Sequence, residues 1–151
     1  MVIRKMTFED YDQAEMLFQK LHKLHVEAEP DLYKMVDKIN KKRDFKKQVK
    51  SEYKVMLCAE ENGRIVGVSN TKMCTSGMTD VKMAFIDALY VEDEFRGKGI
   101  GKALFLETEK LVKEKGAKRL DLHVWEFNSE AVHFYKALGM QIQRYTLEKD
   151  L

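Results

Sequence analysis

The chain has 151 residues, of which 44% are apolar and 34% charged, a balance typical of one globular domain rather than of a disordered segment. Lysine and arginine number 27 against 25 acidic residues, which excludes a large net charge that would draw the whole molecule to nucleic acid or to a membrane surface. The two cysteines fit neither a disulfide framework nor the spacing of a metal site. No apolar run is long enough to span a bilayer, and the first residues do not have the pattern of a signal peptide. We therefore expect one cytoplasmic domain over residues 1–151.

The first thirty residues predict a strand followed by a helix. Residues 2–6 form the apolar strand pattern, Thr7 is a helix cap, and Pro30 ends the helix. His22 and His25 lie three residues apart and could share one helical face. No further ligands are spaced nearby, so we favour solvated or pocket-lining histidines over a metal site.

Residues 34–75 predict a basic helix and then a hairpin. Lysine and arginine dominate residues 34–54, and a solvated helix face is favoured there over a patch for an acidic partner. Residues 53–60 and 64–75 read as two strands, and Asn62-Gly63 between them is the strongest hairpin-turn signal in the sequence. Residues 76–80 form a flexible link to the next strand.

Residues 83–111 predict a buried strand, a turn and a helix, in that order. Three glycines within five positions precede the helix, so the backbone can approach a ligand and aim its N–H groups at one point. Helix N-termini favour anions through unpaired donors and the positive end of the dipole. The turn is therefore predicted to bind phosphate, with basic side chains around it: Arg96, Gly97, Lys98, Gly99, Ile100, Gly101 and Lys102.

Spacing separates this turn from two common phosphate-binding loops. A dinucleotide-binding fold requires a third glycine where this chain has Lys102. A Walker A loop requires its second glycine at that same position, followed by lysine and then serine or threonine. Both classes are excluded.

The last third predicts a strand, a short helix and a final strand. Apolar and polar residues alternate over 120–125, as in a strand with one solvated face. Asn128 or Ser129 caps a helix that Gly139 ends, and residues 140–147 are expected to form the last strand.

Two of these segments resemble the GNAT superfamily of acetyl-CoA-dependent N-acetyltransferases. One is Arg96-x-x-Gly99-x-Gly101, and the other is N-x-x-A-x-x-F-Y-x-x-x-G over residues 128–139. The family usually has Phe after that last glycine, where this chain has Met140. The resemblance implies an α/β fold with a mixed, twisted sheet, splayed between its fourth and fifth strands and with helices on both faces.

The resemblance also implies how acetyl-CoA would bind. Its pyrophosphate would lie on the turn over residues 96–101, and its pantetheine arm would pair with Leu89 and Val91 as an added strand would. The Leu89 N–H would polarise the thioester oxygen, and Asn128 would bond the pantetheine arm besides capping its helix. The expected coenzyme site also includes Ala131 and Phe134, which belong to the second motif, and Tyr90, which lies between Leu89 and Val91.

Three residues are candidates for the chemistry. Tyr135 matches the family position that protonates the leaving thiolate, a role suited to a phenol with a pKa of about 10. Asp87 is the only charge in an apolar strand, so base or substrate contact and a structural hydrogen bond are both open. His123 is a second candidate base, because a histidine titrates near neutral pH.

The implied reaction is acetyl transfer to a primary amine by direct attack, without a metal. In this family the first two helices and their link shape the acceptor site, here around His25, Glu29 and Tyr33. A cationic small molecule, such as a polyamine, an aminoglycoside or an amino-acid derivative, is favoured over a protein or peptide amine. A non-catalytic acyl-CoA-binding module and a nucleic-acid-binding scaffold are the alternatives from other classes, and a homodimer is left open.

Overall fold

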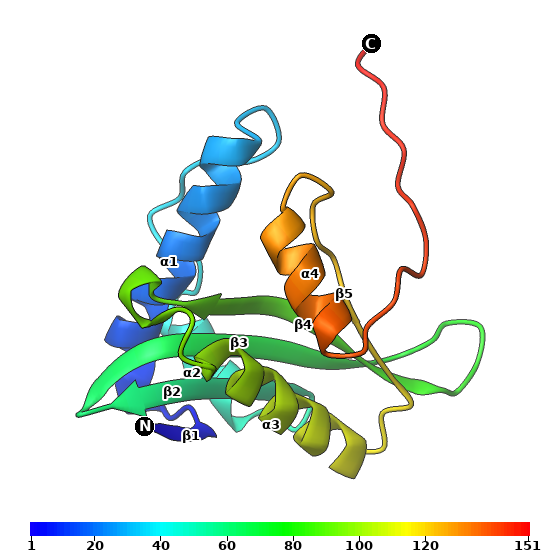
Figure 1. Cartoon of the computed structure of the whole chain (residues 1–151). Coiled ribbons are helices and arrows are strands. Elements are labelled where there is room, and N and C mark those ends of the chain that lie inside the picture. The colour runs from blue at the N-terminus through cyan, green and yellow to red at the C-terminus, as the bar shows by residue number, and fades with distance from the viewer.

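Five strands form one mixed sheet in the computed structural model, which describes all residues 1–151 (Figure 1). The strands follow one another across the sheet in chain order, antiparallel from β1 to β4, and β5 lies parallel to β4. Their bounds are β1 Val2–Lys5, β2 Lys54–Glu61, β3 Arg64–Thr75, β4 Lys82–Val91 and β5 Arg119–Leu122. The predicted mixed sheet is confirmed.

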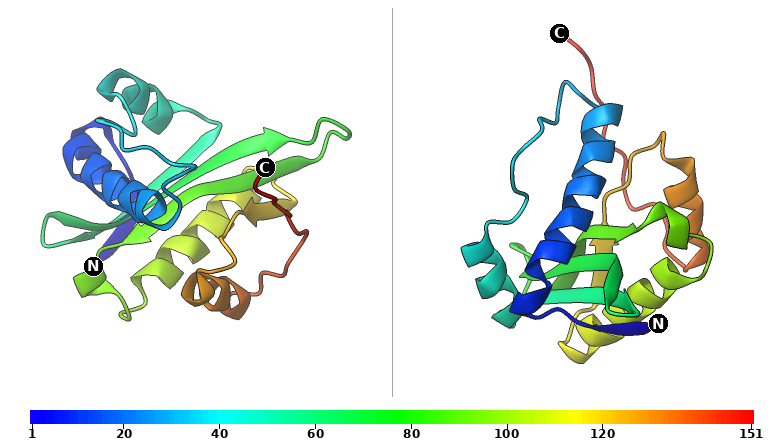
Figure 2. Two further views of the ribbon diagram at one scale, coloured as in Figure 1. Left: turned by 90° about the horizontal axis from the view of Figure 1, so that it is seen from above. Right: turned by 90° about the vertical axis from the view of Figure 1, so that its left-hand side faces the viewer.

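Helices cover both faces of this sheet, as predicted. Figure 2 shows α1 and α2 on one face and α3 with α4 on the other. The helices are α1 Tyr11–Ala28, α2 Lys42–Lys50, α3 Ile100–Glu114 and α4 Ser129–Ala137, with short 3-10 turns η1 Phe8–Asp10 and η2 Asp93–Phe95. None of them combines the length and apolar character that crossing a membrane requires.

Each face has its own apolar core because successive strand residues point to opposite sides. On the α1 face, Leu17 and Phe18 pack with Phe45 of α2 over Met56 and Val68 of the sheet. On the α3 face the core includes residues from the helix and from three strands: Leu104, Val112, Leu57, Val66 and Val91. The sheet is therefore buried on both sides in its middle, and α3 is held firmly against it.

Two irregularities interrupt the strand ladders. The β2–β3 hairpin turns at Asn62 and Gly63, whose φ angles of 51° and 76° confirm the predicted turn. The first irregularity lies in this hairpin beside Ala59. The second lies between β3 and β4, where Asn70 pairs with Ala88 but Thr71 pairs with Ile86, so that Asp87 is the extra residue of a β-bulge.

The parallel contact between β4 and β5 is short. Pairing begins at Met83 with Arg119 and ends at Ile86 with Leu122, although β4 continues to Val91. The edge of residues 87–91 that faces β5 therefore has no neighbouring strand. The predicted splay between the fourth and fifth strands is confirmed.

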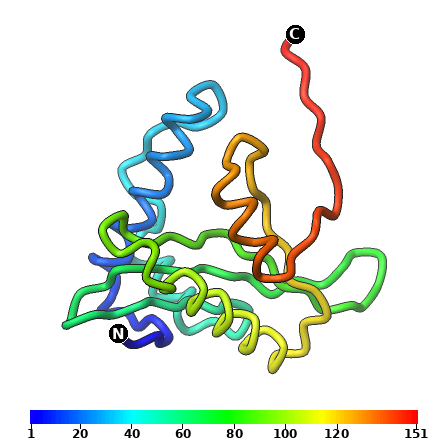
Figure 3. Tube along the Cα trace, viewed as in Figure 1, coloured from blue at the N-terminus to red at the C-terminus, as the bar shows by residue number.

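Two predictions about secondary structure were wrong. Residues 140–147 form no strand; the chain instead leaves the sheet after α4 and runs outward, as the trace in Figure 3 shows. The Met140 N–H still donates to the Tyr135 carbonyl, but residues 141–147 make no backbone hydrogen bond, because the chain runs away from the β5 ladder. The basic region contains a helix only over Lys42–Lys50, and residues 29–41 form a loop whose backbone bonds local carbonyls and the Glu15 side chain.

Candidate functional site

The glycine-rich turn presents a row of unpaired backbone donors at the start of α3. Gly97 and Gly99 adopt left-handed conformations, with φ of 74° and 81°. None of the N–H groups of residues 97–102 donates to a backbone carbonyl, and the first helical bond runs from Ala103 to Gly99. Six consecutive free donors at the positive end of a helix dipole are suited to a phosphate group.

Basic side chains surround these donors in different ways. Arg96 turns back toward β4, where its Nε donates to the Val91 carbonyl at 3.0 Å and its guanidinium pairs with Asp93 at 3.0 Å. Through these two contacts Arg96 fixes the glycine-rich turn to the end of β4. Lys98 lies 4.8 Å from the centre of the Phe95 ring, and no ion pair engages Lys102.

The helix α4 closes the other side of the splay. A Cβ added at Gly101 would lie 3.4 Å from the Phe134 ring and 3.7 Å from a methyl of Val91. The first turn of α3, the end of β4 and α4 therefore meet at this point. Asn128 caps α4 by accepting a hydrogen bond from the Ala131 N–H at 3.2 Å, which confirms the predicted cap.

The remaining residues of the expected coenzyme site lie along the free part of β4. Leu89 packs toward α3, whereas Tyr90 is buried on the α1 face, 5.4 Å from the Arg96 guanidinium. Ile100 is buried as the first residue of α3. The backbone of this edge faces the splay, and its role toward a pantetheine arm stays a prediction.

Tyr135 lies on α4 between two aromatic neighbours. Its ring centre is 5.0 Å from that of Phe134 and 6.1 Å from that of Phe105 on α3. Burial raises the pKa of Tyr135 to about 12, because the apolar surroundings disfavour the phenolate. The phenol is therefore protonated throughout the neutral range, as a proton donor to a thiolate must be.

Asp87 is exposed and paired, contrary to the expectation of a lone charge within an apolar strand. Its carboxylate lies 3.1 Å from Lys72 Nζ and 3.4 Å from Lys54 Nζ. The bulge in β4 explains this placement, since an extra residue re-aims the side chains beside it. The carboxylate needs no catalytic role to account for its position, although the bulge does set it beside the open end of the splay.

His123 follows β5 directly and contacts the same region through Phe85. The two rings meet edge to face with their centres 4.9 Å apart. Lys72 Nζ, which pairs with Asp87, also lies 5.0 Å from the centre of the Phe85 ring. Asp87 and His123 are therefore linked only indirectly, through Lys72 and the Phe85 ring.

An aromatic cluster spans the loop after α1 and the loop before α4. Tyr33 stacks on His25 with ring centres 5.3 Å apart and meets Trp125 edge-on at 6.3 Å. Trp125 in turn stacks on Phe127 at 5.7 Å. Burial and the neighbouring His22 lower the pKa of His25, so this histidine is neutral at pH 7.

The other predicted acceptor residue, Glu29, has a structural role through its backbone. Its N–H donates to the His25 carbonyl, and its own carbonyl accepts from the Tyr33 N–H at 3.0 Å. This bond fixes the turn that returns Tyr33 to the helix. No group of three or more His, Cys, Asp or Glu side chains is placed to hold a metal ion.

Most of the predicted residues therefore converge on the splay, from β4, the turn, α4 and the end of β5. Sequence reasoning missed Trp125 and the two lysines of Asp87. The only tryptophan of the chain, set just after a half-polar strand, was a usable signal. The lysines were not predictable, because their approach to Asp87 depends on the bulge.

Comparison with known proteins identifies the fold and its relatives. The family model described as acetyltransferase (GNAT) family matches residues 18–140. An uncharacterized N-acetyltransferase of Methanocaldococcus jannaschii is 30% identical over 140 residues, or 92% of this chain and 60% of that protein. The thialysine N-epsilon-acetyltransferase of Bos taurus is 37% identical over 57 residues, or 38% of this chain and 34% of that protein.

A solved structure matches the whole chain. A mutant form of the BH1408 protein from Bacillus halodurans is 28% identical, with a TM-score of 0.92 over 100% of this chain and 99% of that one. By contrast, this chain spans about 60% of the M. jannaschii protein's length and about a third of the bovine one's.

Proposed function

Because the chain belongs to the GNAT family of acetyltransferases, we propose that it transfers the acetyl group of acetyl-CoA to a primary amine by direct attack. The observation that carries the proposal is the row of unpaired N–H groups over residues 97–102, next to the free edge of β4. A pyrophosphate would accept from the turn, and a pantetheine amide would pair along the strand edge.

Different groups of the chain would bind successive parts of acetyl-CoA, from the pyrophosphate to the thioester. The donors of the turn and the Lys102 ammonium offset phosphate charge. The β4 edge at Leu89 and Val91 has no neighbouring strand, so it offers the backbone groups of a strand edge, apart from the Val91 carbonyl, which already accepts from Arg96. Phe134 closes the wall opposite Gly101. Acetyl-CoA supplies an activated thioester, from which an amine can take the acetyl group.

Two groups would assist the bond changes at the thioester. The Leu89 N–H would stabilise negative charge that develops on the thioester oxygen, a contribution of about 2.7–4 kcal/mol for a single donor in comparable sites. Tyr135 would donate its phenolic proton to the departing sulfur. Its raised pKa keeps the phenolic proton in place at every physiological pH, and it also makes the phenol a weaker acid than an exposed tyrosine.

The acceptor amine must lose a proton before it attacks. Asp87 and His123 are the candidates, and their indirect link through Lys72 and Phe85 supports a role for both at the acceptor end of the site. His123 is exposed and can pass a proton to water. Asp87 would hold the acceptor's ammonium where that ammonium replaces one of the two lysines with which Asp87 pairs.

We infer that the acceptor is a small cationic amine. The aromatic cluster of His25, Tyr33 and Trp125 provides ring faces beside the acceptor end, and such faces attract ammonium groups. The bovine relative's name specifies the ε-amine of a lysine analogue. An amino-acid derivative or a polyamine fits both observations, and a protein amine is the second candidate, favoured only by the basic residues 34–54.

The deciding experiment measures thiol release from acetyl-CoA against amino acids, polyamines, aminoglycosides and N-terminal peptides. Tyr135→Phe should lower kcat by about a hundredfold, the lower end of the range for general acid catalysis, without changing the Kd for acetyl-CoA. Tyr53→Phe removes the hydroxyl of an exposed tyrosine and serves as the matched control.

Three outcomes count against parts of the proposal. Unchanged turnover in Tyr135→Phe would remove this residue as the acid. Failure of acetyl-CoA to raise the melting temperature would reject the coenzyme site itself. Binding of acetyl-CoA without turnover of any amine would favour the acyl-CoA-binding module.

A further inference from the structure

The loop between α1 and α2 is fixed along α1. Glu15, Gln19 and His22 lie on one stripe of that helix, and each side chain contacts the backbone of the loop. The contacts join Glu15 to the Asn40 N–H at 3.0 Å, Gln19 to the Asp37 carbonyl at 2.8 Å and His22 to the Lys34 carbonyl at 2.7 Å. At the end of the loop, the Tyr11 hydroxyl donates to the Asn40 carbonyl at 2.7 Å. Residues 34–40 are therefore an ordered surface segment.

This fixed backbone leaves apolar side chains in solvent. Met35, Val36 and Ile39 are exposed, although the loop that carries them is held in place. Single exposed apolar residues are ordinary, but three within five positions of an ordered segment form a patch. A patch of this kind marks a surface that another molecule or a membrane covers.

Basic side chains surround these apolar ones, along the loop and on α2. The basic segment, residues 34–50, contains 8 basic and 2 acidic residues, a net charge of +6. The rest of the chain has 19 basic and 23 acidic residues, a net charge of −4, so the small total charge conceals a strong separation. All eight basic residues of the segment are exposed: Lys34, Lys38, Lys41, Lys42, Arg43, Lys46, Lys47 and Lys50.

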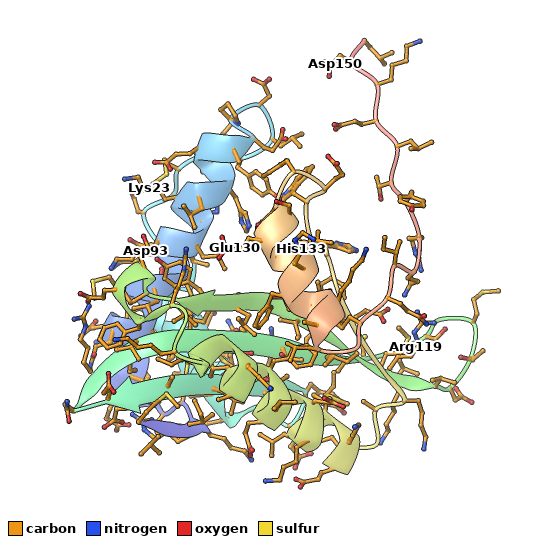
Figure 4. All side chains as sticks on the ribbon, in the orientation of Figure 1. Lys23, Asp93, Arg119, Glu130, His133 and Asp150 are labelled. Carbon is orange, nitrogen blue, oxygen red and sulfur yellow. The ribbon has the colours of Figure 1, made fainter.

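None of the seven lysines of the basic segment is in an ion pair. Its only ion pair joins Arg43 to the adjacent Asp44 at 3.7 Å. Lysines of the neighbouring α1 are paired instead: Lys20 with Glu92 at 2.7 Å, and Lys23, labelled in Figure 4, with Glu27 at 3.7 Å. Seven ammonium groups without carboxylate partners repel one another, so an anionic partner would relieve that repulsion.

The composition of the basic segment favours an anionic membrane over other acidic partners. Protein interfaces are enriched in arginine and aromatic residues and depleted in lysine, whereas this surface has seven lysines and one arginine. Surfaces for single-stranded nucleic acid stack bases on exposed aromatic rings, and the only aromatic residue here, Phe45, is buried. Lysines around aliphatic side chains match a bilayer surface, where ammonium groups meet lipid phosphates and aliphatic groups enter the interface.

We propose that the basic segment binds the surface of an anionic lipid membrane, with its lysines at the headgroup phosphates and Met35, Val36 and Ile39 in the interface below them. Figure 2 shows α2 and the loop that leads to it on the side of α1 away from α4, so a bilayer on this surface leaves the splay accessible. The attachment is peripheral, and it does not depend on the proposed acetyl transfer.

The first test measures cosedimentation of the full chain with lipid vesicles. Vesicles of phosphatidylcholine mixed with phosphatidylglycerol should bind the chain, and vesicles of phosphatidylcholine alone should not. Lys41→Gln combined with Lys47→Gln should lower the partition coefficient about 25-fold, or about fivefold for each lysine. Lys118→Gln combined with Lys149→Gln removes the same charge at two exposed lysines elsewhere, and this control should bind as the unmodified chain does.

A second test measures the apolar contribution. Met35 is 61% exposed and Met78, in the loop after β3, is 93% exposed, so replacing either by serine should leave the fold intact. Met35→Ser should weaken binding to the anionic vesicles about tenfold, because the side chain no longer buries apolar surface in the interface. Met78→Ser is the matched control and should bind unchanged.

Several outcomes would overturn the proposal. The first is absent binding to the phosphatidylglycerol vesicles, or equal binding to phosphatidylcholine alone. Equal losses in the two lysine pairs would show that total charge, and not the basic segment, governs binding. Unchanged binding of Met35→Ser would show a purely electrostatic surface, and tighter binding of RNA or polyglutamate than of the vesicles would assign that surface to another polyanion.

Discussion

A single methyl group added at Gly67 should loosen the contact between the sheet and α3. Gly67 lies in β3 and faces the helix at close range. A Cβ at this position would lie 3.1 Å from Leu104 Cδ1, 3.3 Å from Ile100 Cγ2 and 3.3 Å from the Tyr90 carbonyl oxygen. All three contacts are tighter than ordinary van der Waals contact, and one of them is with backbone that cannot rotate away.

The expected loss follows from two opposing effects. Overpacking a filled core costs about 1–3 kcal/mol. Replacing glycine by alanine restricts the unfolded chain and returns about 0.4–1 kcal/mol. From the midpoints of the two ranges we therefore expect Gly67→Ala to lower the free energy of unfolding by about 1.3 kcal/mol, which for a domain of this size corresponds to a Tm lower by about 3–5 °C.

Urea denaturation of Gly67→Ala beside Gly77→Ala tests this expectation. A Cβ at Gly77 meets nothing within 4 Å, so the control should stay within about 0.5 kcal/mol of the unmodified protein. Because Ile100 and Leu104 belong to the first turns of α3, Gly67→Ala should also weaken acetyl-CoA binding. A Gly67→Ala protein as stable as the unmodified chain would refute the close approach of helix and sheet.

Three further predictions concern charge and the acceptor end. Hydrogen bonding to Arg4 lowers the pKa of Asp10, so their pair stabilises the fold above the ordinary value of 3.8 and loses that contribution as the pH falls through the folded pKa. Melting curves should show a destabilised Asp10→Asn at pH 7 that converges on the unmodified protein as the pH falls below 3.8 and Asp10 becomes protonated. Lys72→Met should lower the KM for a cationic acceptor, since Asp87 loses its 3.1 Å partner, while an unchanged KM would separate Asp87 from the acceptor. Tyr33→Ala should raise the acceptor KM without changing the Kd for acetyl-CoA, and acceptor binding should change the fluorescence of Trp125 only while Tyr33 is present.

Local sequence signals predicted the parts of the fold that local physics determines. The Asn62-Gly63 turn, the end of α1 before Pro30 and the Asn128 cap each depend on the conformational preference of a few neighbouring residues. The glycines before α3 likewise marked the turn with free donors.

The bulges could not be predicted, and they decide the surroundings of Asp87. Extending the hairpin from Glu61 opposite Arg64 without an irregularity would set Lys54 opposite Thr71, whereas the structure sets it opposite Lys72. No residue pattern marks such a slip of one position, because it depends on how the strands pack. The exposure of Asp87 was misjudged for the same reason.

The final strand was mispredicted for a different reason. Residues 140–147 have the composition of a strand, but a strand forms only where the segment pairs with an edge, and this segment runs away from the unpaired edge of β5. The β-propensity of a segment depends on its own residues and does not show whether a neighbouring strand is present to pair with it.

The edge-on contact between Tyr33 and Trp125 has a thermodynamic consequence. It joins the loop that follows α1 to the loop that leads into Asn128 and α4. A ligand that orders either loop therefore biases the conformation of the other. By reciprocity, if acetyl-CoA raises the affinity for the acceptor by some factor, the acceptor raises the affinity for acetyl-CoA by that same factor. If the proposed function holds, this contact would let acetyl-CoA and the acceptor together favour a ternary complex over either binary one.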